Sequence, residues 1–196
     1  MIFCTHPRIN QQSIWIQSII DHINLRNGEE LSRLEDIDPI YLHTFHDTLT
    51  IHPERRNMNG TFGFNFITSI GQNQFAHIIA INQDACSCLN LSINEIGAVT
   101  LHELGHIYNE LPTTLVERIS FGMKPNAKKE YKYNLELRAD CFAAKFGFRD
   151  ELISALTKSL GSDLYVSIHD ELQRRITELQ TDNYPYLDGK YKVASF

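Results

Sequence analysis

The sequence predicts an α+β fold, in which a small antiparallel sheet packs on one central helix and the C-terminal half is mostly helical. Three observations support this prediction. Phenylalanines alternate at positions 62, 64 and 66, which is the two-residue period of a half-buried strand. From Ser92 onward the apolar residues follow helical spacing instead. A length of 196 residues with 42% hydrophobic residues suits a single domain over residues 1–196.

Residues 1–91 are predicted to form one helix and the sheet. Isoleucines at positions 16, 19, 20 and 23 have helical spacing, so we expect an amphipathic helix over residues 10–27 that stops at Gly28. Short β-like runs occupy residues 41–82, with a polar turn at residues 71–74. The turn leads into a predicted strand over residues 75–81, which completes the small antiparallel sheet.

Residues 92–181 are predicted to be the helical part of the domain. Ser92 and Glu95 have the spacing of a capping box, in which each side chain accepts a hydrogen bond from the backbone of the other. A helix should therefore begin here. We expect it to run to about Glu110 and to end before Pro112.

Three more helices are expected after this one. The first should cover residues 127–146 and be closed by Gly147, since glycine is the usual residue just past a helix end. Two further helices are expected over residues 150–160 and 163–181. A short extended tail over residues 182–196 should follow them.

Composition and charge argue against several classes of protein. A net charge of −6 and a pI near 5.8 disfavour a nucleic-acid binder, because phosphate contacts need a basic surface. No stretch approaches the roughly 18 apolar residues of a membrane span, so no stable membrane insertion is expected. The N-terminus lacks the apolar run of about 7–15 residues that a signal peptide requires. We interpret the four cysteines as reduced thiols, which favours a cytoplasmic location.

The sequence HELGH, at residues 102–106, lies inside the predicted helix. Residues four apart share a helix face, so His102 and His106 can present their imidazoles to one metal ion. Zinc suits this pair, because it takes nitrogen and oxygen donors and keeps one position open in catalytic sites. Glu103 is placed to act as a general base toward a water molecule made acidic by the metal. A chance match on a core helix is the alternative.

Two carboxylates in ELRAD, at residues 136–140, are the candidates that complete the site. Glu136 can serve as the third ligand of one zinc ion per chain, while Asp140 can bond a ring nitrogen of a ligating histidine and select its tautomer. Taken alone, the pair would be a surface feature of an amphipathic helix. A third histidine ligand of the HExxHxxGxxH type is excluded, because Asn109 and Pro112 occupy the positions it requires.

His169 and Arg175 lie six residues apart in HDELQRRI, a little under two helical turns, so both can face broadly the same way. A histidine in such a place can donate a hydrogen bond to a developing oxyanion, and an arginine can orient acidic groups around a metal. On these residues alone, a solvated helix with ordinary charge pairs is the simpler interpretation.

The motifs HELGH, ELRADCFAA and IHDELQRRI, in this order, resemble the M48 group of gluzincin metallopeptidases, the relatives of the CAAX prenyl protease and the HtpX heat-shock protease. The resemblance covers residues 92–180 and implies a zincin-like fold. It implies that Glu136 is the third zinc ligand and Asp140 its supporting partner. It also implies that His169 assists the transition state and that Arg175 belongs to the active-site network.

Two features depart from that group, and a second group is also similar. Asp170 stands where the M48 group usually has proline, and the chain lacks the transmembrane helices of the membrane-embedded members. ADCFAA, at residues 139–144, is similar to the M78 group of small soluble proteins typified by ImmA and IrrE, whose members cleave or regulate repressors. That similarity implies, as an alternative, a narrow-specificity regulatory protease or a zinc-stabilised regulatory binding module.

Similarity to gluzincins further implies that an extended peptide binds along an edge strand beside the metal-binding helix. Residues 75–82 are the candidate, with Phe75, His77 and Ile79 as substrate contacts, and an ordinary buried strand is the alternative. The leading hypothesis is a zinc-dependent metallopeptidase that acts on a peptide or protein substrate. An amidase that acts on a non-protein amide is a third hypothesis.

Overall fold

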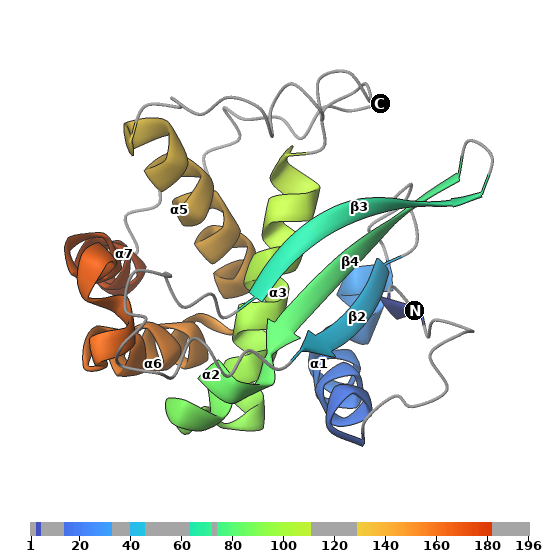
Figure 1. Ribbon diagram of the computed structural model, residues 1–196, viewed down its shortest axis with the longest axis horizontal. Helices are drawn as coiled ribbons and strands as arrows, with labels where there is room; N and C mark the ends of the chain where they lie inside the picture. The colour runs from blue at the N-terminus through green and yellow to red at the C-terminus, as the bar shows by residue number, and fades with distance from the viewer. Residues whose placement is uncertain are drawn as a thin grey trace.

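The computed structural model describes residues 3–4, 14–32, 40–45, 63–71, 74–110 and 129–181. The fold of these residues is α+β, as predicted, with a sheet and several helices arranged around one central helix, α3 (Figure 1). The predicted tail, residues 182–196, lies outside the described residues. The elements follow in the order β1 (Phe3–Cys4), α1 (Ile14–Ser32), β2 (Ile40–Phe45), β3 (Gly63–Gly71), β4 (Gln74–Asn82), α2 (Gln83–Cys88), α3 (Ile93–Glu110), α5 (Lys129–Lys145), α6 (Arg149–Leu160), the 3-10 helix η2 (Asp163–Ile168) and α7 (His169–Thr181).

The described strands form one sheet in the order β1-β2-β4-β3, and this sheet is mixed. Strands β3 and β4 pair as an antiparallel hairpin, but β2 runs parallel to β4, with Leu42 opposite Ile79, and β1 runs parallel to β2. The prediction of an antiparallel sheet is therefore wrong for these two parallel pairs. Strand β3 follows β2 in the chain and runs in the opposite direction. Strand β4 turns back from β3 and therefore runs in the same direction as β2. Alternation within each strand carries no information about this long-range pairing.

Helix α1 continues beyond its predicted end, through Gly28 to Ser32. A glycine inside a helix costs only about 1 kcal/mol relative to alanine, which packing can offset. Here Leu31, in the last turn, is 1% exposed and joins the hydrophobic core. Burial of this side chain accounts for the continuation past the glycine.

Helices α3 and α5 have the caps that the sequence predicts. The backbone N–H of Ser92 donates to Oε2 of Glu95 at 2.6 Å, and the N–H of Glu95 donates to Oγ of Ser92 at 3.3 Å, which is a capping box. After α5, Gly147 has a φ of +78°, and the N–H of Phe148 donates to the carbonyl of Ala143. This left-handed residue ends α5 and turns the chain directly into α6.

The predicted helix over residues 163–181 is interrupted, and one short helix was not predicted. Residues 163–168 form the 3-10 helix η2, in which Tyr165 departs from helical geometry with φ −119° and ψ 20° while its side chain is buried. Helix α7 then begins at His169. The unpredicted helix α2 is capped by Asn82, whose side chain accepts hydrogen bonds from the N–H groups of Asp84 and Ala85.

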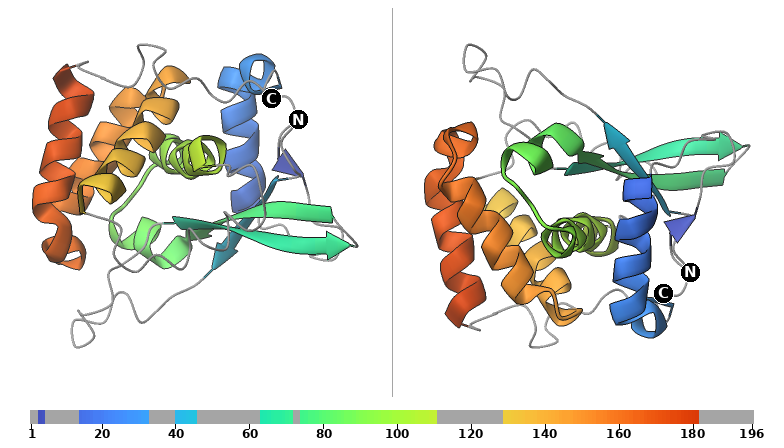
Figure 2. Two further views of the ribbon diagram at one scale, coloured as in Figure 1. Left: turned by 90° about the horizontal axis from the view of Figure 1, so that it is seen from above. Right: turned by 90° about the horizontal axis from the view of Figure 1, so that it is seen from below.

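Helix α3 is covered by other elements on nearly every side (Figure 2). Helix α1 flanks it on one side, helices α5 to α7 lie on the other, and the sheet crosses a third face. Leu101 and Leu104 of α3 are fully buried, as are Ile19 of α1 and Ile79 of β4. This packing holds α3 in a fixed position, so the side chains of α3 that do not face the core are also held in place.

None of the described helices combines the length and apolar character that crossing a membrane requires.

Candidate metal centre

Helix α3 presents His102 and His106 side by side on one face, as their spacing predicts. Their Nε2 atoms are 3.1 Å apart, and the two rings are nearly perpendicular. Between them, Gly105 lies against α5: a Cβ added there would lie 2.9 Å from Cα of Ala139 and 2.9 Å from Cβ of Phe142. The absence of a side chain at Gly105 therefore lets α3 and α5 approach closely enough for residues of both helices to meet.

Helix α5 brings Glu136 to the two histidines. Its Oε2 is 3.3 Å from Nε2 of His102, and its Oε1 is 3.4 Å from Nε2 of His106. A tetrahedral centre with bonds of about 2.1 Å holds its ligand atoms roughly 3.4 Å apart, so these separations fit one small cation. These three residues could hold a metal ion.

Asp140 lies one turn beyond Glu136 and supports His102 from behind. Its Oδ1 is 2.7 Å from Nδ1 of His102, and the side chain is 1% exposed. Because an ionised carboxylate only accepts, we assign the proton to Nδ1 of His102, which leaves the Nε2 lone pair directed at the three-residue cluster. Burial alone would raise the pKa of the Asp140 carboxyl, but the Arg175 guanidinium and the bond with His102 lower it. The carboxylate is therefore ionised at neutral pH.

Arg175 of α7 connects the two acidic residues. Its Nε donates to Oδ2 of Asp140 at 2.8 Å and its Nη2 donates to Oδ1 at 2.6 Å, while Nη1 is 2.9 Å from Oε2 of Glu136. Burial would raise the pKa of Glu136, but the charge of the Arg175 guanidinium holds it well below its ordinary value. The arginine thus keeps both carboxylates charged and fixes their positions.

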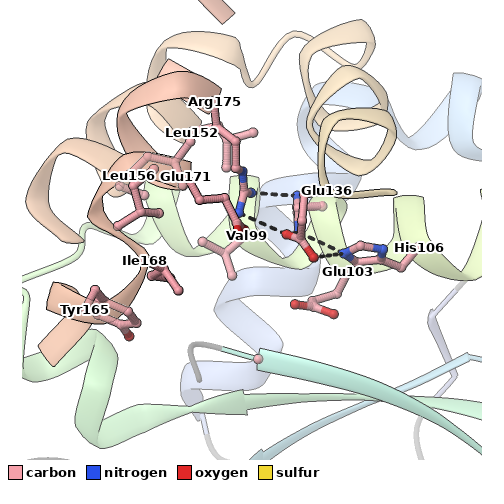
Figure 3. Close-up of a pocket in the computed structure, with 14 residues that line it drawn as sticks. Val99, Glu103, His106, Glu136, Leu152, Leu156, Tyr165, Ile168, Glu171 and Arg175 are labelled. Atoms are coloured by element: carbon pink, nitrogen blue, oxygen red, sulfur yellow. Dashed lines mark hydrogen bonds and ion pairs between the residues drawn. The ribbon is translucent and has the colours of Figure 1, made fainter. Parts of the chain in front are cut away.

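Glu103 lies next to this cluster, on the side that faces the sheet (Figure 3). It is 7% exposed and lines the same pocket as His102, His106 and Glu136. Strand β3 passes close by, since a Cβ added at Gly63 would lie only 3.3 Å from Cγ of Glu103. The Glu103 side chain therefore lies between β3 and the candidate ligands His102, His106 and Glu136.

A pocket of about 240 Å³ opens in front of the cluster. His169 is half-buried at the first position of α7, whereas its neighbours Ile168 and Glu171 line the pocket. The structure therefore brings His102, Glu103, His106, Glu136, Asp140 and Arg175 together but does not place His169 among the pocket-lining residues. The role of His169 in the transition state stays a prediction.

The predicted substrate strand is in the wrong place for strand addition. Strand β4, which carries Phe75, His77 and Ile79, is paired with β2 on one side and with β3 on the other. His77 and Ile79 are buried in this sheet, and the Phe75 side chain lies outside the described part of the structure. Among the described strands β1 and β3 are the two edges, and Gly63 of β3 lines the pocket. Of these two strands, β3 has an unpaired side in the described sheet, and β4 does not.

Sequence reasoning did not find one whole side of the pocket. Apolar side chains of α6 and η2, together with Glu171 of α7, contribute to it. Leu152, Ala155 and Leu156 do have helical spacing in the sequence, but the same spacing is typical of core residues. No local signal separates these two roles, because the pocket exists only where three distant segments meet.

Comparison of the chain with protein-family models, curated proteins and solved structures found no match. The three-residue cluster, the Asp140–Arg175 pair and the pocket beside Glu103 are thus the observations from which a function can be proposed.

Proposed function

We propose that this protein is a zinc-dependent metallopeptidase that hydrolyses peptide bonds with Glu103 as general base. The observation that carries the proposal is the arrangement of His102, His106 and Glu136, whose donor atoms lie 3.1–3.4 Å apart beside Glu103 in an open pocket. Two imidazoles and one carboxylate favour zinc over calcium or magnesium, which prefer oxygen ligands throughout. Three protein ligands are also typical of catalytic zinc sites, whereas structural sites are usually closed by four.

When bound, zinc supplies a Lewis acid that makes water more acidic and polarises an amide carbonyl. The chain's own residues supply the proton chemistry. Glu103 accepts the proton of the attacking water and returns it to the leaving amine, as a general base and then a general acid. Asp140 holds the Nδ1 proton of His102, and Arg175 holds Asp140 and Glu136 in place. These contacts orient the site before any substrate arrives.

The edge of the sheet supports a peptide as the substrate. Within the described strands, β3 pairs on one side only, and its first residue, Gly63, lines the pocket. An extended peptide that adds to β3 by backbone hydrogen bonds would cross in front of Glu103. The motif resemblance to gluzincin peptidases agrees with this placement.

We also place the enzyme in the cytoplasm, since Cys86, Cys88 and Cys141 are free.

Metal analysis paired with an unbiased digest tests the proposal. The purified protein is loaded with zinc, dialysed, and assayed both for zinc content and for cleavage of a peptide mixture by mass spectrometry, with and without a chelator. We expect one zinc ion per chain and cleavages that the chelator abolishes and added zinc restores. One zinc ion per chain with every peptide left intact would instead support the regulatory binding module. Failure to bind zinc would overturn both.

A further inference from the structure

Gly63, the first residue of β3, lies where the sheet meets the candidate metal centre. It is buried, it lines the pocket together with His102, Glu103 and His106, and it pairs with Ile81 of β4. Glu103 lies on the side of the metal-ligand residues that faces this sheet (Figure 3). Gly63 therefore belongs both to the sheet and to the pocket.

The space beside the Cα of Gly63 is already occupied from three directions. A Cβ added there would lie 3.0 Å from Cδ1 of Ile81, 3.1 Å from the carbonyl oxygen of Ala80 and 3.3 Å from Cγ of Glu103. Ordinary van der Waals contacts of a Cβ atom lie at 3.4–4 Å, so all three distances are too short. At least one of these neighbours would have to move to make room for a side chain.

Two of the three neighbours are fixed by the sheet. Ala80 and Ile81 belong to β4, which pairs with β2 on one side and with β3 on the other, and they are 3% and 0% exposed. The close-packed interior gives such groups little room to shift. Glu103, by contrast, is anchored in α3 only at its backbone and reaches the pocket through rotatable bonds. A side chain at residue 63 would therefore displace Glu103.

The proposed chemistry depends on the position of Glu103, because proton transfer needs a short contact. A general base has to lie within about 2.6–3.2 Å of the atom that gives up the proton. A misplacement of about 1 Å can lower the rate of a reaction about 100-fold. With no side chain at Gly63, β3 borders the methylene groups of Glu103 directly and leaves them in place.

We infer that Gly63 is a positioning residue for Glu103: its missing side chain lets β3 border the general base closely without displacing it. This inference rests on the proposed function, since Gly63 acts only through Glu103. Gly105 has a different effect, because its missing side chain lets α3 approach α5 and thereby brings Glu136 to the two histidines. Gly105 affects the metal ligands, whereas Gly63 affects the base.

Acetohydroxamate, a small zinc chelator, tests the inference without requiring turnover. Its hydroxyl group can donate a hydrogen bond to a carboxylate beside the bound metal, so its affinity depends on the position of Glu103. The compound is titrated by calorimetry into the zinc-loaded forms of the wild type, Gly63→Ala, Glu103→Gln and the variant that carries both substitutions. Competition with a chromophoric chelator measures the zinc affinity of each protein.

We expect Gly63→Ala to weaken acetohydroxamate binding about tenfold, the size of a lost hydrogen bond to a charged group, and to leave the zinc affinity unchanged. Glu103→Gln should weaken acetohydroxamate binding by at least the same factor. In the Glu103→Gln background, Gly63→Ala should change the affinity by less than about twofold, because the carboxylate that it displaces is no longer there.

Two further variants separate a local effect on Glu103 from general damage to the sheet. Ile81→Val removes Cδ1, the atom nearest to the added Cβ. Combined with Gly63→Ala, it should restore most of the acetohydroxamate affinity, because the new methyl group can move into the vacated space and away from Glu103. Gly28→Ala is the control, since its Cβ has no neighbour closer than 3.8 Å and Gly28 does not line the pocket. Melting curves establish that each variant folds.

The outcomes separate this inference from the proposed function. If Gly63→Ala binds acetohydroxamate like the wild type, or weakens binding equally with and without Glu103, Gly63 does not act through Glu103 and the inference is overturned. A large loss of zinc affinity in Gly63→Ala would overturn it as well, since the residue would then affect the metal ligands. If Gly63→Ala does not fold, the sheet itself requires the glycine, and the inference is equally wrong.

Two results would point instead at the proposed function. If acetohydroxamate does not bind the zinc-loaded wild type, the proposed open metal centre is wrong. If it binds but Glu103→Gln leaves its affinity unchanged, Glu103 does not lie beside the bound metal. In both cases the inference about Gly63 falls together with the role proposed for Glu103.

Discussion

Arg175 donates two hydrogen bonds to the two carboxylate oxygens of Asp140, at 2.8 and 2.6 Å, in a setting where both side chains are almost completely buried. Such a bidentate pair fixes the plane of the carboxylate. Asp140 in turn accepts from Nδ1 of His102 at 2.7 Å. The position and tautomer of a candidate metal ligand therefore depend on a residue of α7, which is more than seventy positions away in the chain.

This relationship predicts a loss of metal affinity in Asp140→Asn. The amide cannot carry the charge that pairs with Arg175, and its oxygen is a weaker acceptor than a carboxylate for the proton on Nδ1 of His102. Loss of such an outer partner typically weakens metal binding about 10- to 100-fold. Competition with a chromophoric zinc chelator measures the change. Asp150→Asn, at an exposed position in the first turn of α6, is the control that should keep wild-type affinity. Equal zinc affinity in the two variants would contradict the supporting role of Asp140.

Close packing of α3 on α5 predicts opposite effects at two glycines. Gly105→Ala adds a Cβ within 2.9 Å of Cα of Ala139, so the helices must separate, which costs about 1–3 kcal/mol and should displace Glu136 from the histidines. Gly28→Ala adds a Cβ whose nearest neighbour is 3.8 Å away within helix α1, and it should stabilise the protein by up to about 1 kcal/mol.

Denaturant unfolding of both variants measures these changes in the free energy of unfolding. Stabilisation by Gly105→Ala equal to that by Gly28→Ala would show that α3 and α5 are not in close contact.

The capping residue Glu95 predicts a specific loss of stability in acid. Burial alone would raise the pKa of its carboxyl, but hydrogen bonds from Lys158, Ser154 and Ser92 lower the pKa to about 2. The unfolded chain, with an ordinary pKa near 4.5, therefore binds a proton between these values while the folded chain does not. The stabilisation is fully present above about pH 4.5 and is lost as the pH falls toward 2.

Chemical unfolding at a series of pH values, with Glu95→Gln for comparison, measures this contribution. The variant should be less stable than the wild type at neutral pH by about 1–3 kcal/mol, since a charged hydrogen-bond acceptor is removed. The difference should shrink as the pH falls below 4.5. A difference that stays constant down to pH 2 would rule out the ionised Glu95 as its source.

The candidate metal centre could be predicted from the sequence because its parts are local. His102 and His106 are one turn apart, as are Glu136 and Asp140, so a helix alone determines which side chains share a face. The capping box at Ser92 likewise lies within four residues. One further contact, between α3 and α5, completes the group, and Gly105 leaves room for it. It brings the Glu136 carboxylate oxygens within 3.3–3.4 Å of the Nε2 atoms of the two histidines.

Features that depend on distant pairing could not be predicted in the same way. The parallel pairing of β2 with β4 leaves β3 at one edge of the described sheet, and nothing in the alternation of either strand indicates which neighbour it takes. The pocket-lining residues Leu152, Ala155 and Leu156 have the spacing of ordinary core residues. The backbone departure at Tyr165, inside η2, follows from tertiary packing that helix propensity does not include.

The substitution Glu103→Gln tests the central claim most directly, because it removes the general base and leaves His102, His106 and Glu136 unchanged. Zinc content and the rate of cleavage of a peptide that the wild-type protein cuts are measured on both proteins under identical conditions. We predict one zinc ion per chain in each, with a cleavage rate at least about 100-fold lower in the variant, the smaller end of a general base's usual contribution. Cleavage by the zinc-loaded variant at the wild-type rate would contradict the account.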